Sequence, residues 1–89
     1  NKCMRIIFDP VKDKINIEKH GFSLADAAKM DMRKVVEDER VDYGEIRYRA
    51  WGYIEGEACS LAFTITKDGV RAISLRHVHN KEIKKYVKK

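Results

Sequence analysis

The chain has 89 residues, of which 44% are hydrophobic and 37% are charged. This balance is typical of a folded globular protein with one modest core and excludes a disordered chain. No apolar run approaches the roughly 18 residues that cross a bilayer, and we find no signal-peptide pattern. We therefore expect a cytoplasmic protein with a single domain over residues 1–89.

The formal net charge of +5 is concentrated towards the C-terminal end of the sequence. Residues 67–89 carry eight Lys or Arg against two acids, whereas residues 1–42 carry nine of each sign. Residues 43–66 carry two basic and three acidic side chains. A localised basic surface is the usual electrostatic footprint of a polyanionic partner, most often nucleic acid. The alternative is a solvated helix face that binds nothing.

The first segment predicts a short strand followed by a helix. Met4–Phe8 is apolar and ends at Asp9, which resembles an N-cap. The helix is then expected over Pro10–His20, with proline at its first position and Gly21 as its stop. One side of this helix is a polar stripe with the spacing i, i+4, i+7 and i+8. The stripe consists of Lys12, Asn16, Lys19 and His20.

The next segment predicts a second helix and then a loop. Ser23–Asp26 resembles a capping box with aspartate in its last position, so a helix is expected to run to about Met32. Residues 37–42 are mostly acidic and show no burial pattern. We expect them to form a loop after a short strand at Val35–Val36.

Alternating apolar and polar residues predict three strands in the second half of the chain. These strands cover Glu45–Ile54, Ala58–Thr66 and Val70–His77. Lys67–Gly69 is a clear hairpin signal between the last two strands. Asn80 then caps a final basic helix with an apolar seam.

Together the elements predict an α+β fold, in which a β-α-α segment precedes a three- to four-stranded antiparallel sheet and a basic C-terminal helix. Each helix has one apolar stripe to bury, so we expect the helices to cover one face of the sheet. The covered face is expected to hold Leu61, Phe63, Ile65, Ile73 and Leu75. The open face is expected to hold Ser60, Ala62, Thr64, Thr66, Ala72, Ser74 and Arg76. With Arg47 or Arg49 on this face, it would form a shallow trough rimmed by guanidinium groups, which suits a phosphodiester chain.

The strongest candidate for chemistry lies at the end of the last predicted strand. Arg76 can hold a phosphate through a bidentate fork, and His77 or Glu82 can move a proton near neutral pH. Tyr86 could stack on a base or position a phosphate. The structural alternatives are that Glu82 favours the helix N-terminus through the macrodipole and that Tyr86 is a core aromatic.

Other candidates have equally plain structural alternatives. Lys19 and His20 could reach the same trough, but cations in the last turn of a helix also interact favourably with its dipole. Trp51 is either a core or rim aromatic or a stacking platform for a base. Cys3 and Cys59 lack the spacing of metal ligands, so we expect free thiols and no metal or cofactor site.

Several short motifs follow one another in a recognisable order between Arg5 and Tyr86. They are Phe8-Asp-Pro-x-Lys12, Asn16-x-x-Lys-His-Gly21, Glu45-x-Arg47 with Gly52, and Ile73-Ser-x-Arg76 followed by Glu82 and Tyr86. This arrangement resembles the BrnT toxins, which are the toxin halves of type II toxin–antitoxin pairs. The order and spacing of the motifs together carry the resemblance.

The resemblance implies a fold like that of RelE toxins and a ribonuclease activity that inhibits translation. It also implies a cognate BrnA-like antitoxin, which neutralises the toxin and brings the complex to operator DNA. The residues at matching positions are Lys19, His20, Arg47, Arg76, Glu82 and Tyr86. The chain departs from the family at Thr66, where an arginine is common, and at His77, where a basic or small residue is common. Both departures bear on the rate and preference of cleavage.

We therefore expect a metal-independent endoribonuclease toxin that binds RNA across the open sheet face and the basic helix. The predicted catalytic residues are Lys19, His20, Arg47, Arg76, His77 and Glu82. The predicted RNA-binding residues are Lys12, Asn16, Arg49, Trp51, Lys81, Lys84, Lys85 and Tyr86. Contact with a membrane is not expected, and copies of the chain should associate only through the antitoxin. The alternative, from a different class, is a non-catalytic module that binds nucleic acid or a protein partner through its basic helix.

Overall fold

The structure, a computed structural model, describes residues 5–39 and 44–87. Met4 and residues 40–42, which we predicted in the first strand and the acidic loop, lie outside these ranges. Within them, no helix is long and apolar enough to cross a membrane. The described elements are β1 (Ile6–Ile7), α1 (Pro10–His20), the 3₁₀ helix η1 (Leu24–Lys29), β2 (Asp31–Glu37), β3 (Tyr48–Ile54), β4 (Glu57–Thr66), β5 (Gly69–His77) and α2 (Asn80–Val87).

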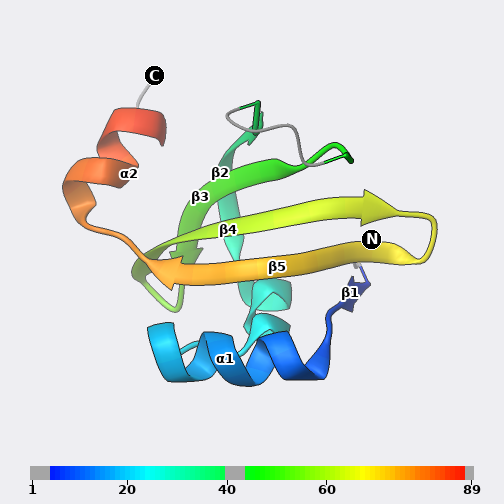
Figure 1. Ribbon diagram of the computed structural model, residues 1–89. Helices are drawn as coiled ribbons and strands as arrows, with labels where there is room; N and C mark the ends of the chain where they lie inside the picture. The colour runs from blue at the N-terminus through cyan, green and yellow to red at the C-terminus, as the bar shows by residue number, and fades with distance from the viewer. Residues whose placement is uncertain (1–4, 40–43, 88–89) are drawn as a thin grey trace.

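The described strands form one sheet in the order β1-β5-β4-β3-β2 (Figure 1). β1 pairs with β5 in parallel, and the other neighbours are antiparallel. The predicted α+β class is therefore confirmed. The sheet itself differs from the prediction, because it is mixed and has five strands where we expected three or four antiparallel ones.

The limits of α1 agree with the capping residues in the sequence. The Asp9 carboxylate accepts a hydrogen bond from the backbone N–H of Val11 at 2.9 Å. At the other end, Gly21 has a φ of 78°, a left-handed conformation that glycine adopts without steric cost. Local chemistry therefore defines both ends of this helix.

The segment after α1 differs from the prediction. The capping box forms, but the helix that it starts is a short 3₁₀ helix that ends at Lys29 and does not reach Met32. The chain instead enters β2 at Asp31, and the strand predicted at Val35–Val36 is only part of β2. Gly52 of β3 permits this pairing, because a Cβ at that position would collide with the carbonyl of Asp31. Pairing with a distant strand thus overrides the local helix signal.

α1 and η1 cover one face of the sheet, below it in Figure 1. Apolar side chains of β3, β4 and β5 meet the buried side of η1 there. The buried core consists of Phe22, Leu24, Ala27, Ala50, Ile54, Cys59, Leu61, Phe63, Val70, Ala72 and Leu75. Cys59 is a free thiol, and burial raises its pKa to about 11, so it remains protonated and unreactive near neutral pH.

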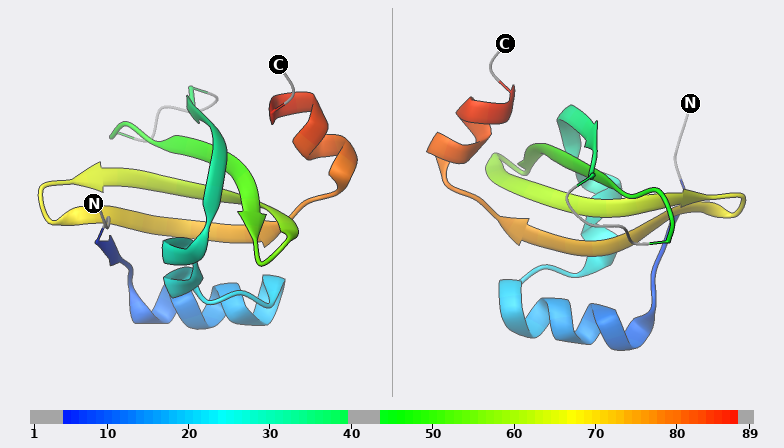
Figure 2. Two further views of the ribbon diagram at one scale, coloured as in Figure 1. Left: turned by 180° about the vertical axis from the view of Figure 1, so that it is seen from behind. Right: turned by 45° about the horizontal axis from the view of Figure 1, so that its top comes forward.

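α2 packs on the opposite side of the sheet from α1, as Figures 1 and 2 show. Trp51 of β3 and Ile83 of α2 are 0% and 1% exposed. The ring of Tyr86 stacks on Trp51 with 4.1 Å between the ring centroids. The expectation that every helix covers the same face is therefore wrong, because the large apolar ring of Trp51 requires its own cover on the second face.

A bulge in β5 exchanges two predicted faces. Ala62 pairs with Ser74, whereas Phe63 pairs with Ala72, so Ile73 is an extra residue in β5. Ala72 is buried in the core, and Ile73 lines the second face. We predicted the reverse, which was wrong because one extra residue shifts the alternation of everything beyond it.

Two residues near the hairpin end of β4 also differ from the prediction. Ile65, expected in the core, is 61% exposed, because the helices do not extend over this end of the sheet. Thr64, expected on the open face, is buried, and its hydroxyl donates a hydrogen bond to the carbonyl of Ile46 at 2.7 Å.

Candidate functional site

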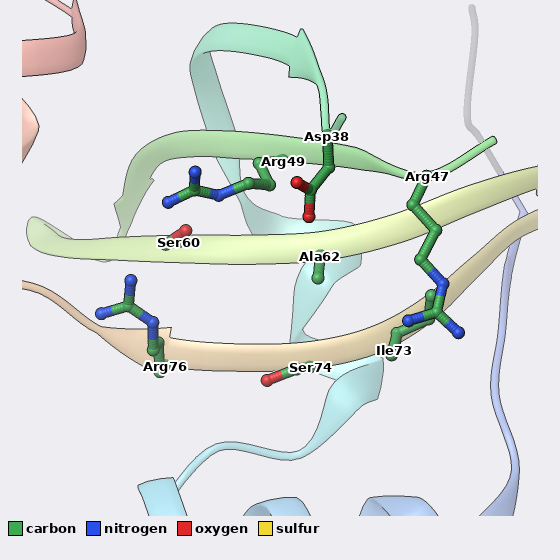
Figure 3. A pocket seen from close by; sticks show the side chains of 8 residues that line it. All are labelled: Asp38, Arg47, Arg49, Ser60, Ala62, Ile73, Ser74 and Arg76. Carbon is green, nitrogen blue, oxygen red and sulfur yellow. The ribbon is translucent and has the colours of Figure 1, made fainter. Parts of the chain in front are cut away.

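A hollow of about 270 Å³ opens on the second face of the sheet, the face opposite α1. Its floor is made of small side chains, Ser60 and Ala62 from β4 and Ser74 from β5 (Figure 3). The small floor that the sequence predicted is therefore present. The other side chains that line the hollow are Asp38, Arg47, Arg49, Ile73 and Arg76.

Strand register brings two arginines to one end of this hollow. β4 lies between β3 and β5 in the sheet. Arg49 of β3 pairs with Ala62 of β4, and Arg76 of β5 pairs with Ser60 of β4. Figure 3 shows the guanidinium groups of Arg49 and Arg76 on either side of the Ser60 end. Arg47 lies at the other end of the hollow. We predicted Arg47 as a catalytic residue together with Arg76, but Arg49 is the arginine that lies beside Arg76, because alternate residues of a strand are about 7 Å apart.

A carboxylate from α2 holds Arg76 in position. Oε2 of Glu82 accepts a hydrogen bond from Nη2 of Arg76 at 3.0 Å and another from Nε1 of Trp51 at 3.1 Å. Burial alone would raise the pKa of Glu82, but these two hydrogen bonds and the positive charges of Arg76 and Arg49 lower it below its ordinary value. Glu82 is therefore a stable carboxylate near neutral pH, which suits positioning Arg76 better than accepting a proton.

Trp51 supports the site from below and does not reach the surface. One side of its ring faces Tyr86, and the guanidinium carbon of Arg49 lies 4.6 Å from the ring centroid. Arg49 is also 5.7 Å from the ring of Tyr86, so both aromatic rings favour its charge through cation–π interactions. We expected Trp51 to contact RNA, but its burial leaves no exposed ring for a base.

A second carboxylate organises the far end of the hollow. Glu45 accepts hydrogen bonds from Nε of Arg47 at 3.0 Å and from Nη2 of Arg71 at 3.0 Å. The hydrogen bond from Arg47 is the main reason that the pKa of Glu45 is lowered, with the charges of Arg71 and Arg47 adding to it against the effect of burial. Arg47 and Arg71 also line a second hollow of about 250 Å³, together with Lys12.

A third hollow, of about 260 Å³, lies between α1 and β5. Lys12, Lys19 and His20 line it from the helix. Asn16, in the middle of the same stripe, anchors α1 to β5, because its amide donates to the carbonyl of Leu75 at 2.9 Å and accepts from the Leu75 N–H at 3.1 Å. Asn16 is buried and also donates to the Phe22 carbonyl, so its amide is used within the fold, and its role in RNA binding stays a prediction.

The three hollows adjoin one another around Ile73, whose side chain lines all of them. Ser74 is shared by the first and third hollows, and Lys12 by the second and third. We call these three adjoining hollows together the basic groove. It runs from the second face of the sheet over β5 to α1. Its cationic residues are Lys12, Lys19, Arg47, Arg49, Arg71 and Arg76, with His20 beside them.

Of the two candidate histidines, only His20 lines the groove. Partial burial is the main reason that the pKa of His20 is lowered from 6.5, and the nearby charges of Lys19, Arg76 and His77 lower it further. Its imidazole is therefore mostly neutral at pH 7. His77 stacks on Phe22 on the covered side, and its Nδ1 lies 3.3 Å from Glu57. The structure thus does not bring His77 to the groove, because adjacent residues of a strand face opposite ways.

The lysines of α2 lie apart from the three hollows. Lys81, Lys84 and Lys85 are exposed, and Lys85 is 5.5 Å from the ring of Tyr86. None of them, nor Tyr86 itself, lines the basic groove. Their roles in RNA binding stay predictions.

Two groove residues, Asp38 and Arg71, were not predicted from the sequence. The N–H of Asp38 donates to the carbonyl of Arg47 at 2.7 Å, which extends the β2–β3 pairing and directs this buried carboxylate into the hollow. The alternation from Val36 to Asp38 was a signal that could have located it. Arg71 had no such signal, because the bulge at Ile73 reverses the alternation of β5. Among the described residues, no three His, Cys, Asp or Glu side chains gather closely enough to hold a metal ion.

Comparison with known proteins agrees with the motifs. No curated protein and no solved structure shows a significant match, so the likeness of the fold to RelE toxins stays a prediction. A family model described as the ribonuclease toxin BrnT of type II toxin–antitoxin systems matches residues 8–82. This match includes every cationic residue of the basic groove and the two carboxylates that hold Arg47 and Arg76. The chain therefore belongs to the BrnT family of ribonuclease toxins.

Proposed function

We propose that this chain, as one toxin domain over residues 1–89, is a metal-independent endoribonuclease that cleaves RNA in the basic groove and inhibits translation in the cytoplasm. The observation that carries the proposal is the pair Arg49 and Arg76, which flank a floor of small side chains from two different strands. Small floor residues let a phosphodiester approach closely, and two guanidinium groups can contact its oxygens from opposite sides.

Arg76 and Arg49 would supply the main electrostatic contribution to catalysis. Negative charge develops on the non-bridging oxygens when a 2′-hydroxyl attacks the neighbouring phosphorus. Cations that are already in position stabilise this charge without reorganising at the moment of reaction. Glu82 and the aromatic pair beneath Arg49 provide that positioning, which supports electrostatic stabilisation as their common role.

His20 is the proposed general base. A largely neutral imidazole can take the 2′-hydroxyl proton, and its place beside Ser74 in the wall of the groove supports this role. The 2′-oxygen would bond to phosphorus as the bond to the 5′-oxygen breaks, and the leaving oxygen would take a proton from water in the open groove. The products would be a 2′,3′-cyclic phosphate and a 5′-hydroxyl. Glu82 is the weaker candidate for the base because its pKa is lowered.

Membership of a type II toxin–antitoxin family supports a protein partner. We propose that a BrnA-like antitoxin neutralises the toxin and carries the complex to operator DNA. The exposed lysines of α2 remain available to contact either RNA or this partner. Co-expression of the antitoxin should therefore reverse growth arrest caused by induction of the toxin.

Cleavage of a labelled single-stranded RNA by the purified protein in EDTA tests the proposal. We expect cleavage to persist in EDTA and to leave 2′,3′-cyclic phosphate ends. A substrate with a 2′-deoxy sugar at the cleaved position should stay intact because it lacks the nucleophile. RNA that is retained without any breaks would instead support the non-catalytic binding module.

A further inference from the structure

We propose that the hollow between α1 and β5 is a second phosphate-binding subsite, which holds the phosphodiester adjacent to the one that is cleaved. The proposal rests on the proposed function, because it concerns the same RNA strand. Lys12 and Lys19 are the residues that bind this second phosphate. In this role Lys19 contributes to affinity and does not transfer a proton.

The two lysines are held on the groove side of α1 by the anchor between them. Lys12, Asn16 and Lys19 follow the spacing i, i+4 and i+7, so all three lie on one side of the helix. Asn16 is tied to the backbone of Leu75 by two hydrogen bonds. Its neighbours on the stripe are therefore directed towards β5, and both line the hollow.

The charge of this hollow favours an anion. Within residues 5–39 and 44–87, no acidic side chain lines it, whereas the other two hollows include Asp38 or Asp9. Burial is the main reason that the pKa of the neighbouring His20 is lowered, and the positive charges of Lys19 and Arg76 lower it further. A phosphate in this hollow would be attracted by Lys12 and Lys19, which line the hollow itself. It would also be attracted by Arg76, which lines the adjoining sheet hollow.

The edge of β5 provides the route between the two subsites. In the part of the chain that the structure describes, β1 pairs with Val70 and Arg71, and no other described strand lies beside the rest of this edge. Ile73 and Ser74 line both the sheet hollow and the α1 hollow, so the two hollows meet at these side chains. An unpaired RNA strand can bend over such an edge because its backbone is flexible, whereas a stiff duplex cannot follow it.

Substitution of both lysines separates binding from chemistry. We expect Lys12→Gln/Lys19→Gln to raise the KM for a single-stranded RNA of about eight nucleotides roughly tenfold, with kcat changed less than about twofold. On a dinucleotide, which has only the cleaved phosphate, the same variant should match the parent. Lys14→Gln is the matched control, because Lys14 is an exposed lysine of the same helix that lines none of the hollows.

Binding without cleavage gives a second, independent measurement. The probe is the same RNA with 2′-O-methyl sugars, titrated by fluorescence anisotropy over a range of salt concentrations. The double variant should reduce the slope of log K against log salt by about 0.7, since the proposed subsite adds one single-strand phosphate contact. Lys14→Gln should leave the slope close to that of the parent.

The outcomes distinguish this inference from the proposed function. Equal affinity and equal slopes for the parent, the double variant and Lys14→Gln would overturn the subsite even if RNA is cleaved. A lower kcat on the dinucleotide would also overturn it, because Lys19 would then act on the reacting phosphate. A parent that binds the probe through both lysines but never cleaves RNA would retain the subsite and reject the ribonuclease.

Discussion

The two faces of this sheet carry opposite kinds of side chain. Under α1 and η1, Leu61 and Leu75 are fully buried and join the strands to the helices. On the second face, the neighbouring residues Ser60 and Ser74 are small, and α2 covers only the end where Trp51 lies. Large apolar residues thus stabilise the sheet from one side, while small ones leave room for arginines on the other. Substitutions on the first face should alter stability, and substitutions on the second should alter activity.

The largest effect is expected on the covered face. Leu61→Ala should lower the free energy of unfolding by about 2–5 kcal/mol, because it removes buried apolar atoms and leaves a cavity. Urea denaturation measures this change. Ser74→Ala on the second face is the matched comparison and should change stability by less than about 1 kcal/mol. Similar losses for the two variants would contradict the division between the faces.

The next effect is expected in the groove. Arg76→Ala should lower the rate of RNA cleavage about a hundredfold, which corresponds to about 3 kcal/mol of barrier, because the charge on the phosphate oxygens loses its main partner. Arg33→Ala is the control, since Arg33 is an exposed arginine of β2 that pairs with Asp31 away from the groove. If Arg76→Ala cleaves RNA as fast as the parent, the assignment of the site fails.

A smaller effect is expected from the residue that holds Arg76. Glu82→Gln keeps an acceptor for Trp51 but removes the charge facing Arg76, so kcat should fall about tenfold with little change in fold. The pKa of Glu82 is lowered in the folded state, so its contribution to stability is present above 4.5 and is lost as the pH falls through the folded pKa. The difference in stability between the parent and Glu82→Gln should therefore vanish on acidification. A difference that stays constant with pH would argue against the ion pair.

The smallest effect concerns pH. Because the pKa of His20 lies below 6.5, its imidazole stays mostly neutral down to that pH. We expect kcat/KM to fall by less than twofold between about pH 8 and pH 6.5, and more steeply at lower pH. His20→Gln should remove this fall in kcat/KM at acidic pH. A limb centred above 6.5 would point to a different base.

Most of the local structure could be predicted from short sequence signals. Asp9 and Gly21 define α1 through their own backbone and side-chain preferences, and Asp68-Gly69 makes the hairpin between β4 and β5. The full extent of β2 could not be predicted in this way, because its pairing depends on Gly52, which lies far along the chain. Local propensity is a weak signal where a distant strand supplies the hydrogen bonds.

The candidate site was predicted in part. The sequence pointed to Arg76, to the small floor, and to the stripe that carries Lys12 and Lys19. It did not show that Asn16 in that stripe is buried against β5, because a polar side chain on a helix gives no sign of the backbone that it will meet. The sequence also did not show that Arg49, and not Arg47, lies beside Arg76. The position of each arginine along the sheet follows from the register of the strands.

The order of charged and apolar residues alone established the helix caps, the hairpin, the strands of the second half, the basic character of the chain and the motifs of its family. Those properties depend on contacts within a few residues or on composition. The placement of α2 over Trp51, the bulge at Ile73 and the joining of three hollows into one basic groove arise only when distant segments pack together. Register and packing depend on long-range contacts, and a change of a single residue in register moves a side chain from one face of a sheet to the other.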